Sequence, residues 1–221
     1  VAGSVIRYTT NGTRPTATTG LIYESPIKLQ PDTAGTTRGT RRLRAAAFHP
    51  DAALQRVATH SYFFLNGLAG PATDGLVSQT NTNSSTQTTA IKNHATYGPL
   101  LGESLASLPA VSINLIPSIP GPTETPASVE FFHPSGAEPE FQIDCGIQAV
   151  GGHSIGSPKN NFRLYFRSQY GASTLDHDIF RDHPYARDHA PAQRFDRIAL
   201  RGGSHDSFFW MGEPANPPMS G

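Results

Sequence analysis

The chain has 221 residues, and its 17 basic side chains are balanced by 17 acidic ones. This balance argues against a nucleic-acid-binding protein, because such proteins present a net positive field to the phosphate backbone. The 21 glycines and 19 prolines favour a turn-rich, mainly β architecture over a helical one. No run of 18 apolar residues occurs, so the sequence predicts no transmembrane helix in this chain.

Residues 1–66 are predicted to form short strands joined by turns. The stretch "SVIRYTTNG" alternates like a strand and ends in the turn pair Asn11-Gly12, where glycine supplies a positive φ. The stretch "RRLRAAAF" at 41–48 is a second predicted strand, and "SYFF" belongs to a third. On the strand at 41–48, one face carries Leu43, Ala45 and Ala47.

This first region resembles the chitobiase C-terminal, or fibronectin-III-associated, repeat of bacterial surface proteins. The matching positions are the strand at 43–48 and Tyr8, Thr9, Asn11, Gly12, Thr13, Pro15, Thr16, Tyr23, Pro26 and Ile27. The resemblance implies a small β-sandwich repeat and an extracellular or cell-envelope location. The first strand of the family is missing or truncated here, and the chain begins inside a strand-like pattern with no visible signal peptide, so we expect the chain to be a piece of a longer protein whose missing start could have carried a secretion signal.

Residues 67–107 are predicted to be a polar linker. The segment at 78–89, "SQTNTNSSTQTT", has no large apolar residue that could offset the entropy lost on ordering it. It should therefore pack against nothing and be the first site of limited proteolysis. A short helix is predicted within "GPLLGESLASLP", whose leucines recur at helical spacing until Pro109.

Residues 108–221 return to a β pattern with longer, more apolar strands. Adjacent hairpins predict one antiparallel sheet with strands near 111–116, 127–133, 140–149, 161–168 and 195–201. The single cysteine, Cys145, shares the apolar face of its strand and is predicted to be a buried core thiol. A reactive nucleophile is the alternative, but no base lies near it in sequence.

The stretch "SPKNNFRLYFRSQYG" predicts a strand with two unlike faces. Its apolar face carries Phe162, Leu164 and Phe166, and its cationic, aromatic face carries Arg163, Tyr165 and Arg167. The loop "GGHSIGSPK" precedes this strand, and it is no P-loop because a strand follows where a helix is required.

Two interpretations of this loop stay open. In the first, the backbone amides of Gly151 and Gly152 meet an anion, Lys159 acts as a point charge on a nucleotide phosphate, and Arg163 is a second donor. In the second, the loop is an ordinary hairpin whose lysine is only hydrated.

Two further polar stretches carry no predicted site. The stretch "LDHDIFRDHPYARDH" offers imidazoles and carboxylates suited to a transition metal, but none at the spacing of two ligands on one helix face. A solvated loop is the simpler interpretation. The adjacent Ser, His and Asp of "RGGSHDSFFW" predict a turn, because triad partners usually come from separate loops.

The blocks "LPAVSI", "PASVEFF", "FQIDCGIQAVGGHSIGSPKNNFRLYFRSQYG" and "FDRIALRGGSHDS" look like the start of the CotH (spore coat protein H) kinase family. The resemblance implies that residues 108–221 are an incomplete N-terminal lobe of a secreted, atypical kinase. The intact parent would transfer a phosphoryl group from ATP, with Mg²⁺, to hydroxyls of a protein substrate. Lys159 and Arg163 would contact phosphate, the catalytic acids would lie beyond residue 221, and this chain alone would be inactive.

A hypothesis of another class is a non-catalytic extracellular module for adhesion or carbohydrate binding, whose partner would be a surface polymer. Tyr8 and Tyr23 would supply its aromatic platform, although such residues also fill the core or edge of a β-sandwich. Catalytic acids downstream of residue 221, or nucleotide binding by the complete protein, would separate this hypothesis from the kinase.

Overall fold

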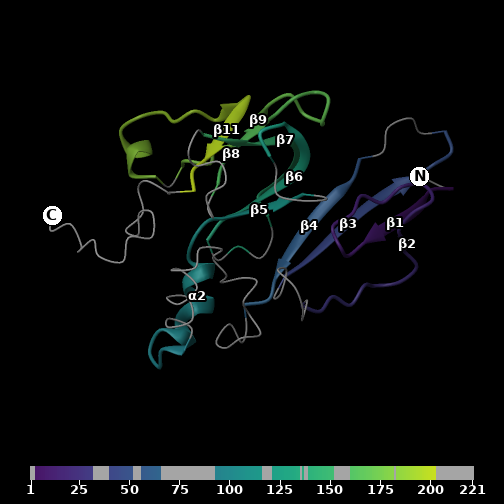
Figure 1. Cartoon of the computed structure of the whole chain (residues 1–221), viewed down its shortest axis with the longest axis horizontal. Helices are drawn as coiled ribbons and strands as arrows, with labels where there is room; N and C mark the ends of the chain where they lie inside the picture. The colour runs from purple at the N-terminus through teal and green to yellow at the C-terminus, as the bar shows by residue number, and fades with distance from the viewer. Residues whose placement is uncertain are drawn as a thin grey trace. The chain divides into compact units, whose positions relative to one another are not determined.

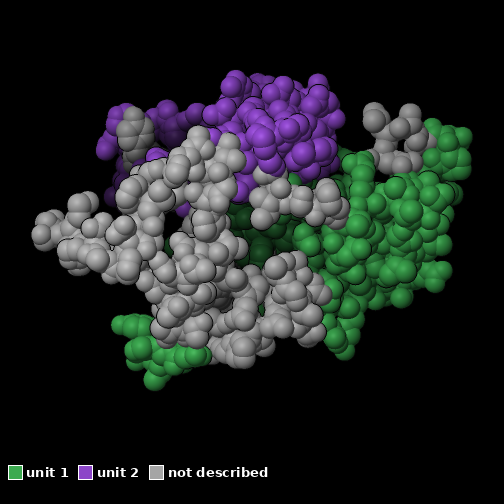
Figure 2. Space-filling model, viewed as in Figure 1, with its two compact units in different colours: residues 1–117, 128–142 green, residues 118–127, 143–221 purple. Residues whose placement is uncertain are grey.

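The computed structural model describes residues 3–31, 40–51, 56–65, 93–115, 121–134, 136, 139–151, 160–181 and 183–202. It is mainly β, as predicted, with a four-stranded, a five-stranded and a two-stranded sheet and a few short helices (Figure 1). The chain divides into two compact units: residues 1–117 with 128–142, and residues 118–127 with 143–221 (Figure 2). None of the helices formed by the described residues has the length and apolar character needed to cross a membrane.

The first sheet lies in unit 1 and has the strand order β2-β1-β3-β4, with every pair antiparallel. Its strands are β1 (Val5–Thr9), β2 (Leu21–Ile22), β3 (Thr40–Phe48) and β4 (Ala58–Phe63). The predicted turn after β1 is confirmed, because Gly12 has a φ of +85°.

The buried face of β3 is the one opposite its predicted apolar row. Ala46 and Phe48 form a buried cluster with Val57. The predicted row of Leu43, Ala45 and Ala47 is half-buried or exposed instead. Both faces of this strand carry small apolar side chains, so alternation alone could not distinguish the covered face from the open one.

The short helix predicted before Pro109 is confirmed. It comprises a 3-10 turn, η3 (Gly98–Leu100), followed directly by α2 (Leu101–Ala106). Pro99 stands in the first turn of η3, where a missing N–H costs no hydrogen bond. The predicted linker segment at 78–89 lies outside the described residues.

The second sheet contains all five predicted strands in the order β11-β8-β7-β6-β5. Its strands are β5 (Ala110–Asn114), β6 (Thr125–Phe132), β7 (Phe141–Val150), β8 (Asn161–Tyr165) and β11 (Arg197–Leu200). The pairs β5–β6, β7–β8 and β8–β11 are antiparallel.

The predicted strand at 195–201 is wrong at its start. Arg194 and Phe195 form a separate strand, β10 (Arg194–Phe195), which pairs with β9 (Leu175–Asp176) in a two-stranded sheet. The chain changes partner at Asp196, whose carbonyl oxygen accepts a 2.9 Å hydrogen bond from the Phe166 amide. The predicted irregular loop at 175–189 therefore begins with a short strand, and it also contains the 3-10 turn η4 (Pro184–Arg187).

The apolar face of β7 and β8 forms the core of unit 2. Cys145 and Ile147 have 0% exposure, and Leu164 and Phe166 have 3%. The predicted buried thiol is therefore confirmed. Desolvation by burial raises the pKa of Cys145 to about 12, because removing water disfavours the thiolate. This cysteine is a core residue rather than a nucleophile.

Candidate functional site

The face of β7, β8 and β11 opposite this core is polar. Strand alternation puts Arg163 and Tyr165 on it, both half-buried, while Leu164 between them is buried. In the register of the sheet, Arg163 lies opposite Gln148 and Tyr165 lies opposite Gly146 and Arg197. The predicted two-faced strand is confirmed, and its polar face is the candidate functional site.

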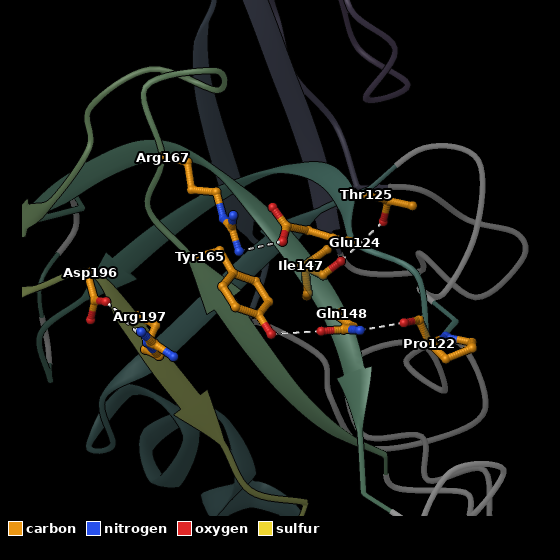
Figure 3. Close-up of polar contacts among 9 residues, drawn as sticks. All are labelled: Pro122, Glu124, Thr125, Ile147, Gln148, Tyr165, Arg167, Asp196 and Arg197. Carbon is orange, nitrogen blue, oxygen red and sulfur yellow. Dashed lines mark hydrogen bonds and ion pairs between the residues drawn. The ribbon is translucent and has the colours of Figure 1, made fainter.

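The segment at 121–124 runs beside β7, where its Gly121 carbonyl oxygen accepts a 2.8 Å hydrogen bond from the Ala149 amide, and its polar groups contact side chains of the polar face (Figure 3). Arg167 approaches Glu124 with 3.1 Å between Nη2 and Oε2, and its guanidinium carbon lies 4.8 Å from the centre of the Tyr165 ring. The Tyr165 hydroxyl donates a 2.7 Å hydrogen bond to Gln148 Oε1, and the amide of Gln148 donates to the carbonyl oxygen of Pro122. The charge of Arg167 is thus neutralised within the chain.

Gly146 makes room for the carboxylate of Glu124 on the central strand. A Cβ at position 146 would meet Oε1 of Glu124 and would lie 2.8 Å from its Cδ and 2.6 Å from Cε2 of Tyr170. Real Cβ atoms essentially never approach heavy atoms within 3.0 Å. The carboxylate therefore reaches this position only because residue 146 is glycine.

A second arginine of the polar face is also neutralised by a carboxylate. Arg197 approaches Asp196 with 2.9 Å between Nη2 and Oδ2, and both side chains are mostly exposed. The hydrogen bond from Arg197 lowers the pKa of Asp196, and the same bond raises the pKa of Arg197. Because both groups are solvated, this pair contributes little to stability.

Arg163 differs from Arg167 and Arg197, because it makes no ion pair with a residue that the structure describes. Of the other predicted phosphate contacts, Gly151 is exposed and has a φ of +120°, so the chain turns sharply where the strand β7 ends. Gly152 and Lys159 lie outside the described residues. Arg163 lies opposite Gln148, three residues before Gly151, and its half-buried guanidinium is chemically suited to binding an anion.

No group of three or more His, Cys, Asp or Glu side chains that could hold a metal ion occurs among the described residues. In the stretch at 175–189, Asp176 pairs with Arg194 at 3.2 Å and Asp178 accepts a 3.0 Å hydrogen bond from Gln193. These contacts tie the two ends of the loop together. The stretch at 203–210 lies outside the described residues.

A second polar cluster, which the sequence analysis did not single out, lies in unit 1. Glu130 of β6 has 0% exposure. Its Oε1 accepts a 3.0 Å hydrogen bond from the Ser61 amide, and its Oε2 accepts a 2.5 Å bond from the Ser61 hydroxyl. His60 Nδ1 lies 3.6 Å from Oε1, and Ser112 Oγ lies 2.7 Å from Ser61 Oγ. The signal that could have revealed it is a carboxylate inside the apolar strand "SVEFF".

Desolvation of Glu130 raises the pKa of its carboxyl group, and the hydrogen bonds from Ser61 and the nearby His60 only partly oppose this effect. Ser61 is 3% exposed, so no substrate reaches its hydroxyl. Ser61 is thus enclosed and hydrogen-bonded to Glu130, as expected for a structural residue.

The comparison with known proteins finds a family match in the first region of the chain. Residues 2–62 match the Fn3 associated family. No curated protein and no solved structure matches the chain. The matched stretch contains β1 to β4 except the last residue of β4, and it agrees with the fibronectin-III-associated repeat predicted from the Asn11-Gly12 turn and the strand at 43–48.

We call residues 2–62 the Fn3-associated segment. Its two tyrosines predicted to form an aromatic platform, Tyr8 and Tyr23, differ in exposure. Tyr23 is 44% exposed and follows the edge strand β2, whose Leu21 and Ile22 are also exposed. Tyr8 is half-buried within β1. Tyr23 is therefore available to a ligand, while Tyr8 mainly contributes to the sheet.

Proposed function

We propose that the chain is part of a bacterial extracellular or cell-envelope protein, in which an Fn3-associated repeat is joined to the phosphate-facing sheet of a CotH-like kinase. In the longer parent, ATP with Mg²⁺ would supply the phosphoryl group and a protein hydroxyl would accept it. The sheet of this chain would bind and orient the phosphates, and it would not carry out the transfer alone.

One observation carries this proposal: Arg163 has no ion pair with a described residue, whereas Arg167 and Arg197 on the same face are each neutralised. A phosphate oxygen is a fitting partner for such a guanidinium, because bidentate, charge-assisted hydrogen bonds match the planar geometry of arginine. Lys159, at the end of the loop before β8, would add a point charge to the same phosphate.

The described residues fit a phosphate but not a magnesium site, since they contain no group of three acids or imidazoles. In the parent, the metal would therefore be held by residues other than those that the structure describes. Arg163 and Lys159 would neutralise charge, and positioning with charge neutralisation is most of what proteins contribute to phosphoryl transfer.

The proposal is tested by ATP binding to the intact parent protein with Mg²⁺. Arg163→Ala or Lys159→Ala should each remove one charge-assisted contact, worth about 1.5–3 kcal/mol, and so weaken binding about ten- to a hundred-fold. Arg194→Ala is the matched control, because Arg194 is 72% exposed and pairs with Asp176 in the separate two-stranded sheet of β9 and β10. A folded parent that does not bind ATP would refute the proposal.

A second candidate, a non-catalytic module for carbohydrate or surface-polymer binding, is favoured by the exposed ring of Tyr23. Tyrosine rings bind sugars through an apolar face while the hydroxyl stays hydrated. Binding of a polysaccharide that Tyr23→Ala abolishes, together with no effect of Arg163→Ala on any ligand, would support this candidate over the kinase.

A further inference from the structure

Within unit 1, β4 of the Fn3-associated segment packs against a polar face of the hairpin formed by β5 and β6. In the register of that hairpin, Ser112 lies opposite Glu130 and Asn114 lies opposite Ser128. Alternation puts these four side chains on one face. Asn114, Ser128 and Glu130 are at most 1% exposed, so this face is covered although it is polar.

Hydrogen bonds among Ser61, Ser112 and Glu130 connect the segment to the hairpin, and we call these three residues the Glu130 joint. Ser61 donates to Glu130 with both its amide and its hydroxyl, at 3.0 and 2.5 Å, and its hydroxyl oxygen lies 2.7 Å from that of Ser112. Each carboxylate oxygen thus has a partner from β4. A buried carboxyl group is tolerated only when it is hydrogen-bonded in this way.

Aromatic packing closes the joint at one end. Phe132, two residues after Glu130 on the same face of β6, lies 5.4 Å from Phe63 and 6.3 Å from His60 between ring centres, edge to face in both cases. Such contacts add stabilisation beyond the apolar area that they bury.

The turn after β1 closes the other end. Gly12 is buried, and a Cβ there would lie 3.1 Å from both Asn114 Oδ1 and the guanidinium carbon of Arg42. Its carbonyl oxygen accepts a 3.3 Å hydrogen bond from Arg44. Glycine at position 12 therefore allows both the turn after β1 and the close approach of the β5–β6 hairpin.

We propose that the β4 surface of the Fn3-associated segment is a docking surface for a β-hairpin that carries a carboxyl group between a serine and an aromatic residue. Its occupant is the β5–β6 hairpin of the same chain. The segment stays bound to that hairpin independently of the connecting residues 66–92. It therefore acts as a fixed partner of the β5–β6 hairpin, and not as a detachable spacer.

The test is made on the full chain, with a protease recognition sequence replacing part of residues 78–89. After complete cleavage, the two pieces should elute together in size-exclusion chromatography and appear as one complex by native mass spectrometry. Two separate pieces under native conditions would overturn the proposal. This measurement needs no variant that weakens folding.

Substitutions at Glu130 then test whether the Glu130 joint holds the two cleaved pieces together. Glu130→Ala should speed separation of the cleaved pieces at least about tenfold, because two charge-assisted hydrogen bonds are lost. Glu130→Gln, which keeps the shape and an acceptor oxygen, should separate no faster than the wild type. Glu103→Ala is the matched control, since Glu103 is exposed on α2. Equal separation rates for Glu130→Ala and Glu103→Ala would refute the role of the joint.

Discussion

Gly146→Ala is a sharp test of how the segment at 121–124 is held on the polar face. The added methyl group would meet the Glu124 carboxylate and lie 2.6 Å from the Tyr170 ring, so both side chains must move. Overpacking of this kind costs about 1–3 kcal/mol. Replacing glycine restricts the unfolded chain and returns about 0.4–1 kcal/mol. The midpoints of these two ranges give an expected net loss of unfolding free energy of about 1.3 kcal/mol.

Urea unfolding followed by circular dichroism measures this loss. Gly121→Ala is the control, because a Cβ there meets nothing within 4 Å, and it should leave stability unchanged or slightly raised. In a Glu124→Ala background the methyl group has room on one side, so Gly146→Ala should cost about 1 kcal/mol less than in the wild type. An equal cost in both backgrounds, or no cost in either, would refute the packing described for Glu124.

Three other predictions concern residues outside the candidate site. The thiol of Cys145, with its pKa of about 12 and no exposure, should resist thiol reagents at pH 8 until the protein is unfolded, and rapid labelling of the native protein would contradict its placement. The folded-state pKa of Glu130 is raised above its ordinary value of 4.5, so its stabilising contribution is full below that pH and is lost as the pH rises through the raised value. The excess stability of Glu130→Gln over the wild type, measured by urea unfolding, should accordingly grow with pH above 4.5, and a constant difference would contradict the raised pKa. Gly20→Ala should lower the unfolding free energy by at least about 1–2 kcal/mol. Gly20 has a φ of +96°, and a Cβ there would lie 2.9 Å from the Tyr8 carbonyl oxygen. An unchanged urea midpoint would exclude this backbone conformation.

The strands of the second sheet were predictable from sequence because each has one apolar and one polar face. In β8, alternation alone identifies Leu164 as buried and Arg163 as lying on the other face. The start of the predicted strand at 195–201 was harder to predict. Nothing in the sequence indicates that the chain changes partner at Asp196, because strand pairing depends on contacts distant in sequence.

The polar contacts of the candidate site were only partly predictable. Arginines in a strand indicate a cationic face, but the neutralisation of Arg167 by Glu124 joins residues 43 positions apart and follows from the fold. Glu130 is a similar case. A single glutamate in an apolar strand indicates a buried carboxyl group, but its partner Ser61 lies 69 positions away on another sheet. Such pairs are properties of tertiary structure, which local periodicity does not encode.

The most direct test of the central claim is a titration of the chain with ATP, followed by NMR of ¹⁵N-labelled arginine side chains. If the polar face binds phosphate through Arg163, the Nε–H signal of Arg163 should shift saturably. The signal should be identified by its loss in Arg163→Lys. Signals of Arg194 and Arg197, which are exposed and paired with carboxylates, should barely move. An Arg163 signal that stays fixed, or a uniform small shift of every arginine, would contradict a phosphate site on this face.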